Sequence, residues 1–128
     1  MGTSPPLVAV VDDDESVRRA MDRLLRSAGY EVVTFNEGAA FLFDFVESGS
    51  RADCVILDLR MPHMSGLDVL LRLIEARRRL PAIILTGMDT PESQRRAVEA
   101  GAVAYLRKPV DDMALLAAVA KGVAQNKS

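Results

Sequence analysis

The stretch Leu7–Asp14, with the sequence LVAVVDDD, decides the fold. Five apolar residues form a run of strand length, and three consecutive carboxylates follow it directly. A run that is apolar throughout, without polar alternation, is typical of a strand covered on both faces, as in a parallel sheet. In open α/β sheets, ligands bind beyond the carboxyl ends of the strands. The stretch therefore predicts a buried strand with a functional site at its end.

Four further runs of strand length follow along the chain. They are Glu31–Phe35, Cys54–Leu57, Ala82–Leu85 and Val103–Leu106. The longer stretches between them carry apolar residues at helical spacing. Alternating strands and helices require right-handed crossovers and a parallel sheet covered by helices on both faces. The predicted fold class is α/β, a (βα)5 doubly wound five-stranded parallel sheet.

Local signals indicate where the helices begin and which faces they bury. Asp14 is expected to cap the first helix, and Thr90 followed by Pro91 is expected to begin the fourth. Apolar residues at helical spacing define the expected inner faces of the third and fifth helices. These residues are Leu67, Leu70, Leu71 and Ile74 in the third helix, and Met113, Leu116, Ala117 and Ala120 in the fifth.

The composition indicates one ordinary globular domain. The 128 residues are 49% hydrophobic and 27% charged, which suits a single core. A net charge of -2 gives no overall field that would favour nucleic acid or an acidic membrane. Neither a membrane-spanning run nor a signal-peptide pattern is present in the sequence. The single cysteine, Cys54, is expected to be a buried unreactive thiol, and a cytoplasmic location is expected.

Polar residues stand at the ends of four of the five predicted strands. Asp12 and Asp13 follow the first strand, and the other three strands are followed by Asp58, by Thr86-Gly87 and by Lys108-Pro109. These strand ends can converge on one pocket, where unpaired carboxylates would be costly to bury. Carboxylate and water oxygens are the ligands that Mg²⁺ prefers. A carboxylate can also attack phosphorus, with the metal and an ammonium group neutralising the phosphoryl oxygens.

Five short segments carry a resemblance to a known family. They are Val10–Asp14 (VVDDD), Leu57–Pro62 (LDLRMP), Met64–Gly66 (MSG), Leu85–Gly87 (LTG) and Lys108-Pro109. In this order and at these intervals, they resemble the receiver domain of two-component response regulators. The segments LRMP and MSGL are closest to FixJ-like regulators. The resemblance covers residues 7–124 and implies a flavodoxin-like strand order, 2-1-3-4-5.

The resemblance implies a metal site around the phosphoacceptor. Asp58 is similar to the aspartate that takes the phosphoryl group, and it also ligates the metal. Asp13 is similar to the direct carboxylate ligand, and Asp12 to the residue that holds the metal through water. The third protein ligand would be the backbone carbonyl of Arg60. The expected metal is Mg²⁺, with Mn²⁺ as an alternative.

The resemblance also implies a switch. Thr86 is similar to the switch hydroxyl, Lys108 to the phosphate-binding lysine, and Tyr105 to the aromatic residue that turns inward when the hydroxyl moves. The Lys108–Pro109 bond is expected to be cis. The phosphodonor would be a histidine kinase, and phosphorylation would change the face made by the fourth helix, the fifth strand and the fifth helix. That face would control an output domain or partner, or form a homodimer.

The expected domain limits are a disordered segment at 1–6, the receiver domain at 7–124 and a polar tail at 125–128. FixJ-like receivers usually precede a helix-turn-helix domain, so this chain is either part of a longer regulator or a stand-alone one, and both remain open. By the same resemblance, the domain would catalyse only its own phosphorylation and dephosphorylation and would be no metabolic enzyme. It would bind neither nucleic acid nor membrane itself.

The same residues are also compatible with purely structural roles and with two different functions. Taken singly, the acidic residues could be helix caps, Asp58 a turn residue, Lys108 an exposed loop cation and Tyr105 a half-buried strand aromatic. A metal-dependent phosphohydrolase would need a second carboxylate beside the nucleophile, whereas Arg60 stands two residues past Asp58. An interaction module without phosphorylation is the second alternative function. His63 is expected to be solvent-exposed, and the run Arg77–Arg79 to be a solvated helix end.

Overall fold

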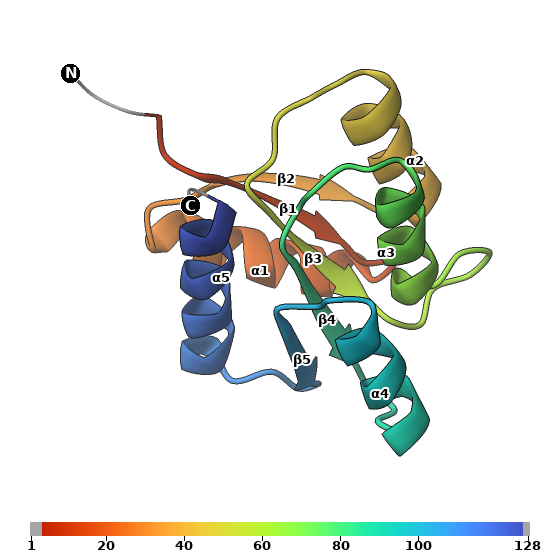
Figure 1. Ribbon diagram of the computed structural model, residues 1–128. Coiled ribbons are helices and arrows are strands. Elements are labelled where there is room, and N and C mark those ends of the chain that lie inside the picture. The colour runs from red at the N-terminus through yellow and green to blue at the C-terminus, as the bar shows by residue number, and fades with distance from the viewer. Residues whose placement is uncertain (1–3, 127–128) are drawn as a thin grey trace.

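Strands and helices alternate along the chain in the computed structural model, which describes residues 4–126 (Figure 1). The strands are β1 (Leu7–Val11), β2 (Glu31–Phe35), β3 (Cys54–Asp58), β4 (Ala82–Thr86) and β5 (Ala104–Arg107). The helices are α1 (Glu15–Ser27), α2 (Gly38–Leu42), the π-helical turn η1 (Phe43–Glu47), α3 (Gly66–Glu75), α4 (Pro91–Glu99) and α5 (Asp112–Asn126). The predicted (βα)5 alternation is confirmed.

The five strands form one sheet in the order β2-β1-β3-β4-β5, as predicted. Every neighbouring pair is parallel. Val11 at the end of β1 lies beside Leu57 of β3, and Asp58 lies beside Leu85 of β4. The carboxyl ends of the central strands therefore meet at one edge of the sheet, which is where the predicted site residues stand.

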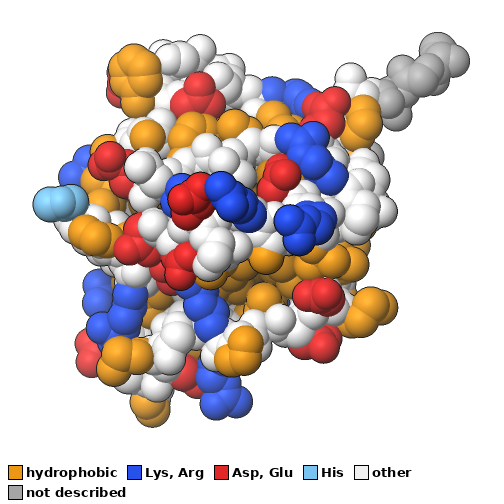
Figure 2. Space-filling view, turned by 180° about the vertical axis from the view of Figure 1, so that it is seen from behind, with side chains coloured by type: hydrophobic (Ala, Val, Ile, Leu, Met, Phe, Trp, Pro, Cys, Tyr) orange, Lys and Arg blue, Asp and Glu red, His pale blue; other side chains and the backbone are white. Residues whose placement is uncertain are grey.

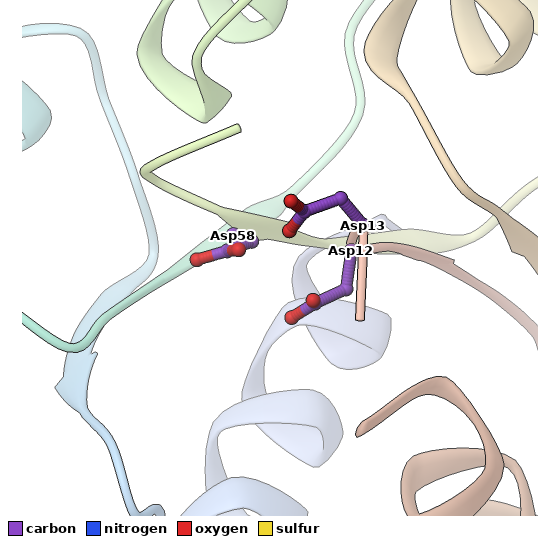
Figure 3. A group of neighbouring side chains, drawn as sticks. All are labelled: Asp12, Asp13 and Asp58. Atoms are coloured by element: carbon purple, nitrogen blue, oxygen red, sulfur yellow. The ribbon is translucent and has the colours of Figure 1, made fainter. Parts of the chain in front are cut away.

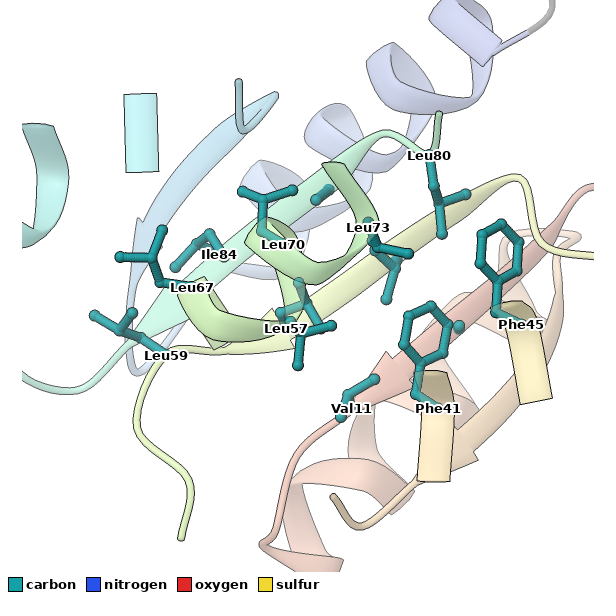
Figure 4. Packing of buried hydrophobic residues seen from close by; sticks show 14 of the residues in the cluster. Val11, Phe41, Phe45, Leu57, Leu59, Leu67, Leu70, Leu73, Leu80 and Ile84 are labelled. Atoms are coloured by element: carbon teal, nitrogen blue, oxygen red, sulfur yellow. The ribbon is translucent and has the colours of Figure 1, made fainter. Parts of the chain in front are cut away.

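Both faces of the sheet are buried, which explains the continuous apolar runs in the sequence. Val8 and Val10 of β1 face a core shared with α1 and α5, whereas Ala9 and Val11 face a second core shared with α2, α3 and α4. Figure 4 shows this second core, in which Phe41 and Phe45 stack with ring centroids 5.6 Å apart. With helices on both sides, the central strands β1, β3 and β4 carry polar side chains only at their carboxyl ends, where Asp58 closes β3 and Thr86 closes β4.

The predicted helix caps are confirmed. The Asp14 side chain accepts hydrogen bonds from the backbone N–H groups of Ser16 and Val17 at the start of α1. The Thr90 side chain accepts a bond from the backbone N–H of Ser93, and Pro91 is the first residue of α4. These bonds satisfy backbone donors that a helix start leaves without an intrahelical acceptor.

The inner faces predicted for α3 and α5 are wrong in part. Leu71 and Ile74 of α3 are 41% and 51% exposed, and Met113 of α5 is 73% exposed. The buried residues are Leu67, Val69, Leu70 and Leu73 in α3, and Leu115, Ala118, Val119 and Val123 in α5. Both helices carry apolar residues on more than one face, so the spacing of these residues does not determine which face packs against the sheet.

The terminal segments are described in part. Residues 1–3 and 127–128 of the predicted disordered segment and tail lie outside the described residues, and residues 4–6 precede β1 without regular structure. Helix α5 continues through Asn126, whose side-chain amide donates to Asp53 at 3.3 Å, so residues 125 and 126 are helical. Within residues 4–126, no helix is both long and apolar enough to cross a membrane. Acidic and basic side chains are interspersed over the face shown in Figure 2.

Candidate functional site

Three carboxylates converge at the carboxyl edge of the sheet. Asp12 and Asp13 follow β1, and Asp58 is the last residue of β3. One oxygen from each lies within 4.8 Å of the others, and Figure 3 shows the three groups around one space. Asp12 and Asp58 are 1% and 5% exposed, whereas Asp13 is exposed to solvent. Sequence reasoning placed all three here, because parallel strands end at one edge.

Within residues 4–126, Lys108 is the one cation that forms ion pairs with these carboxylates. Its Nζ lies 2.9 Å from Asp12 Oδ2 and 3.3 Å from Asp58 Oδ1. The Lys108 backbone N–H donates to the Thr86 carbonyl at 2.8 Å, which anchors the loop after β5 to the end of β4. The bond between Lys108 and Pro109 is cis, as predicted. Lys108 therefore shares one site with Asp12 and Asp58, which lie 96 and 50 residues before it in the sequence.

The electrostatics of the site are unbalanced toward negative charge. Burial and the neighbouring Asp12 carboxylate raise the pKa of Asp58 to about 6, although Lys108 opposes the shift. Burial lowers the pKa of Lys108, but the contacts with Asp12 and Asp58 outweigh it and raise that pKa overall. One ammonium group thus neutralises only part of the charge of three carboxylates.

Some oxygen atoms in the cluster and in the loop after β3 accept no hydrogen bond from residues 4–126. Among residues 4–126, the Asp13 side chain has no hydrogen-bond or ion-pair partner, and no donor reaches the Arg60 carbonyl oxygen. Asp12 differs, because its Oδ1 accepts the Asp14 backbone N–H at 2.9 Å and its Oδ2 contacts Lys108. Carboxylate and carbonyl oxygens are hard donors that suit a small divalent cation. The three carboxylates therefore fit a small divalent cation such as Mg²⁺ or Mn²⁺.

The predicted switch residues lie on the neighbouring strands β4 and β5. Thr86 closes β4, is fully buried, and turns its hydroxyl to its own loop, where Oγ1 donates to the Met88 carbonyl at 2.9 Å. The Met88 N–H donates back to Oγ1 at 3.0 Å. The Tyr105 hydroxyl of β5 is buried and has no hydrogen-bond partner among residues 4–126. Burial, and then the Asp89 carboxylate, raise the pKa of Tyr105.

Gly66 is a site residue that sequence reasoning quoted in a motif without giving it a role. A Cβ on Gly66 would lie 2.5 Å from the Asp58 carbonyl oxygen and 3.2 Å from Leu57 Cβ. The Gly66 backbone N–H also donates to the Leu59 carbonyl at 3.0 Å. The first turn of α3 therefore rests directly on the backbone that carries Asp58, and only glycine fits at this contact.

Two further predictions concern residues at and beyond the edge of the site. His63 is exposed and adopts a φ of 70° in the loop after β3, so it takes no part in the carboxylate cluster. Cys54 is fully buried in β3, and burial raises the pKa of its thiol to about 12. The predicted exposure of His63 and burial of Cys54 are confirmed, and the raised pKa of Cys54 disfavours its reactive thiolate form.

Comparison of the sequence with known proteins identifies response regulators as its relatives. A family model described as "Response regulator receiver domain" matches residues 8–120. Response regulator protein TmoT of Ectopseudomonas mendocina is 37% identical over 119 residues, which are 93% of this chain and 53% of TmoT. Transcriptional regulatory protein FixJ of Azorhizobium caulinodans is 38% identical over 114 residues, covering 88% of this chain and 52% of FixJ. This chain thus spans about half the length of these curated relatives.

The fold has close counterparts among solved structures. A response regulator receiver domain protein from Clostridium thermocellum superposes with a TM-score of 0.88 at 32% identity, covering 95% of this chain and 97% of that one. Sequence match and backbone superposition thus agree along almost the whole chain. The chain belongs to the response regulator receiver domain family of two-component systems.

Proposed function

We propose that Asp58 accepts a phosphoryl group from a histidine kinase in the presence of Mg²⁺ or Mn²⁺. The observation that carries this proposal is the buried Asp58 carboxylate, which shares a 4.8 Å cluster with Asp12 and Asp13 and contacts Lys108 at 3.3 Å. A helix cap or a turn residue would need none of the other charged residues nearby, whereas here three carboxylates and one lysine lie together. Charge of both signs around one carboxylate is the arrangement that phosphoryl transfer needs.

The chemistry is a displacement at phosphorus. An Asp58 oxygen forms a bond to the phosphorus atom as the bond to the donor nitrogen breaks, which gives an acyl phosphate and releases the donor imidazole. With a pKa of about 6, Asp58 is mostly ionised at pH 7 and available for attack. Asp13, Asp58 and the Arg60 carbonyl would hold the metal directly and Asp12 through water. The bound metal supplies charge neutralisation at the phosphoryl oxygens, and Lys108 does the same from the other side.

Phosphorylation would then act on Thr86 and Tyr105. The phosphoryl group adds about two negative charges close to both Lys108 and the end of β4. Thr86 has to exchange its two hydrogen bonds with Met88 for one to the phosphoryl group, and Tyr105 follows into the vacated space. The face made by α4, β5 and α5 would change and control a partner, a homodimer or an output domain beyond this chain. The domain would act in the cytoplasm as a switch, without turning over a metabolite and without itself binding nucleic acid.

The test is intact mass spectrometry with a small-molecule phosphodonor and Mg²⁺. We expect one phosphoryl adduct on the wild type and none on Asp58→Asn or after chelation with EDTA. Asp111→Asn is a matched control, because Asp111 is an exposed carboxylate at the start of α5, and it should be modified like the wild type. An unmodified wild type, with folding verified by circular dichroism, would leave an interaction module as the better function. An adduct on Asp58→Asn would place the acceptor elsewhere.

A further inference from the structure

Two hollows follow each other along the cleft between α3 and α4. The first, of about 480 Å³, is bordered by Leu67 of α3 and Arg96 of α4. The second, of about 940 Å³, is bordered by Leu70 and Ile74 of α3 and by Ala100 after α4. Leu67 and Leu70 lie one turn apart, as do Arg96 and Ala100, so the hollows occupy consecutive stretches of the same cleft. We call this cleft the α3–α4 groove.

The α3–α4 groove is lined by positive charge alone. Its described lining includes five of the 16 basic residues of the chain and none of its 18 acidic residues. Those five residues are Arg60, Arg77, Arg78, Arg79 and Arg96. In a chain with a net charge of -2, such a segregation makes the groove a local positive patch on an acidic molecule.

Most of these guanidinium groups are not used by the fold. Arg78 is held in place, because it donates to the Phe45 carbonyl at 3.0 Å and covers the Phe45 ring at 4.2 Å. The side chains of Arg60, Arg77, Arg79 and Arg96 are exposed and make no ion pair or hydrogen bond with any residue in 4–126. Elsewhere in the fold, arginines such as Arg19 and Arg26 are paired with an acid one helical turn away.

The walls of the groove also offer apolar surface. Ile74 is 51% exposed beside the second hollow. Leu70, Leu73 and Pro81 line the same hollow. Arginines around an apolar floor match a ligand that brings carboxylates and apolar side chains together, since guanidinium groups bind carboxylates through paired N–H donors.

We propose that the α3–α4 groove is a docking site for a short acidic protein segment that also carries apolar side chains. Its carboxylates would pair with Arg77, Arg79 and Arg96, and its apolar residues would cover Ile74. This surface goes beyond the proposed switch face, because α3, the residues after it and α4 supply most of its lining, and α5 supplies only Gln125 and Asn126. A nucleic acid duplex fits less well. Its phosphates could pair with the arginines, but it presents no apolar side chains to cover the leucine and isoleucine residues that line the hollow.

The test is selection from a displayed library of random 15-residue peptides on the unphosphorylated protein. The groove variant is Arg77→Glu with Arg79→Glu. The matched control is Arg23→Glu with Lys121→Glu, which makes the same charge change at exposed positions of α1 and α5, on the opposite face of the sheet. Enriched peptides would be synthesised and their binding measured by fluorescence anisotropy, alongside a labelled DNA duplex and the same peptides with their apolar residues replaced by serine.

We expect the enriched peptides to contain an excess of Asp and Glu together with Leu, Ile or Phe. The groove variant should weaken their binding about tenfold or more, the control variant less than twofold, and higher salt should weaken binding as well. Enriched peptides without an acidic excess, or an equal loss in both variants, would overturn the proposal. Tighter binding of the DNA duplex than of any peptide would assign the groove to nucleic acid. Unchanged binding of the serine-substituted peptides would remove the apolar part of the proposal. Because phosphorylation is not needed, failure here is distinct from failure of the proposed function.

Discussion

Substituting Gly66 by alanine tests whether the start of α3 positions the acceptor aspartate. The added Cβ would lie 2.5 Å from the Asp58 carbonyl oxygen, whereas ordinary contacts of a Cβ begin at 3.4 Å. The two backbone segments must therefore move apart by about 0.9 Å, the difference between these distances. Neither side has a flexible side chain to absorb the movement, because Asp58 is held in the β3–β4 ladder and Gly66 is bonded to Leu59.

The movement should affect both stability and phosphorylation. Overpacking costs about 1–3 kcal/mol, and the lower chain entropy of alanine in the unfolded state offsets about 0.4–1 kcal/mol. We expect Gly66→Ala to lower the free energy of unfolding by about 1–2 kcal/mol. A misplacement of about 1 Å can slow a reaction by about 100-fold, so the rate of phosphorylation by a small-molecule donor should fall about 10- to 100-fold.

Gly38→Ala is the matched control. Gly38 also begins a helix, and its added Cβ would meet an atom at the same 2.5 Å, but that atom is Val69 Cγ2, which belongs to a side chain. Urea unfolding and the time course of the intact mass would be measured for both variants. Gly38→Ala should lose some stability while keeping the wild-type rate within about twofold. A wild-type rate in Gly66→Ala, or an equal slowing in both variants, would refute the positioning role of Gly66.

Three further predictions concern Asp58, Lys108 and the α1 cap Asp14, which stand at or just after the ends of β3, β5 and β1. Asp58 binds protons more tightly when folded, with a pKa of about 6 against 3.8, so its contribution to stability is fully present below pH 3.8 and is lost as the pH rises through 6. In EDTA, Asp58→Asn should therefore be about 1 kcal/mol more stable than the wild type at pH 8 but not at pH 4, as judged by urea unfolding, and a pH-independent difference would contradict this. Lys108→Met leaves two buried carboxylates without their cation and should destabilise the fold by about 2–3 kcal/mol at pH 8; an unchanged denaturation midpoint would show that the ion pairs with Asp12 and Asp58 contribute nothing. Asp14→Ala removes the α1 cap and should lower the urea concentration at the unfolding midpoint, whereas Asp14→Ser should keep most of the wild-type midpoint, and equal losses would rule out the capping role.

Sequence reasoning succeeded where one physical constraint acts on a short segment. The strand Leu7–Val11 is apolar at every position because helices cover both of its faces, and a run this short and this apolar, followed by carboxylates, fits a central parallel strand well. Asp14 and Thr90 were identifiable as caps because a helix start needs nearby acceptors. The candidate cluster followed from the parallel sheet, which brings Asp12, Asp13 and Asp58 to one edge.

Sequence reasoning was less successful where several faces of a helix are apolar. In α3, Leu71 and Ile74 fit a helical repeat as well as Leu73 does, and only packing on β3 and β4 decided that Leu73 is inside. The π-helical turn at Phe43–Glu47 had no signal in the repeat of apolar residues either. Periodicity measures how apolar residues are spaced, but it does not state which partner surface they meet.

The sequence by itself determined the (βα)5 fold and the residue types that gather at the end of the sheet. Burial of a strand on two faces requires an apolar run, and a helix start requires a capping residue, so each of these features can be recognised within one short segment. Tertiary structure alone decided the distances and the contacts between distant segments. The approach of Gly66 to the Asp58 backbone, the ion pairs of Lys108 and the arginine-lined groove between α3 and α4 all depend on how helices settle on the sheet. That placement is set by close packing of the whole core, which no single segment contains.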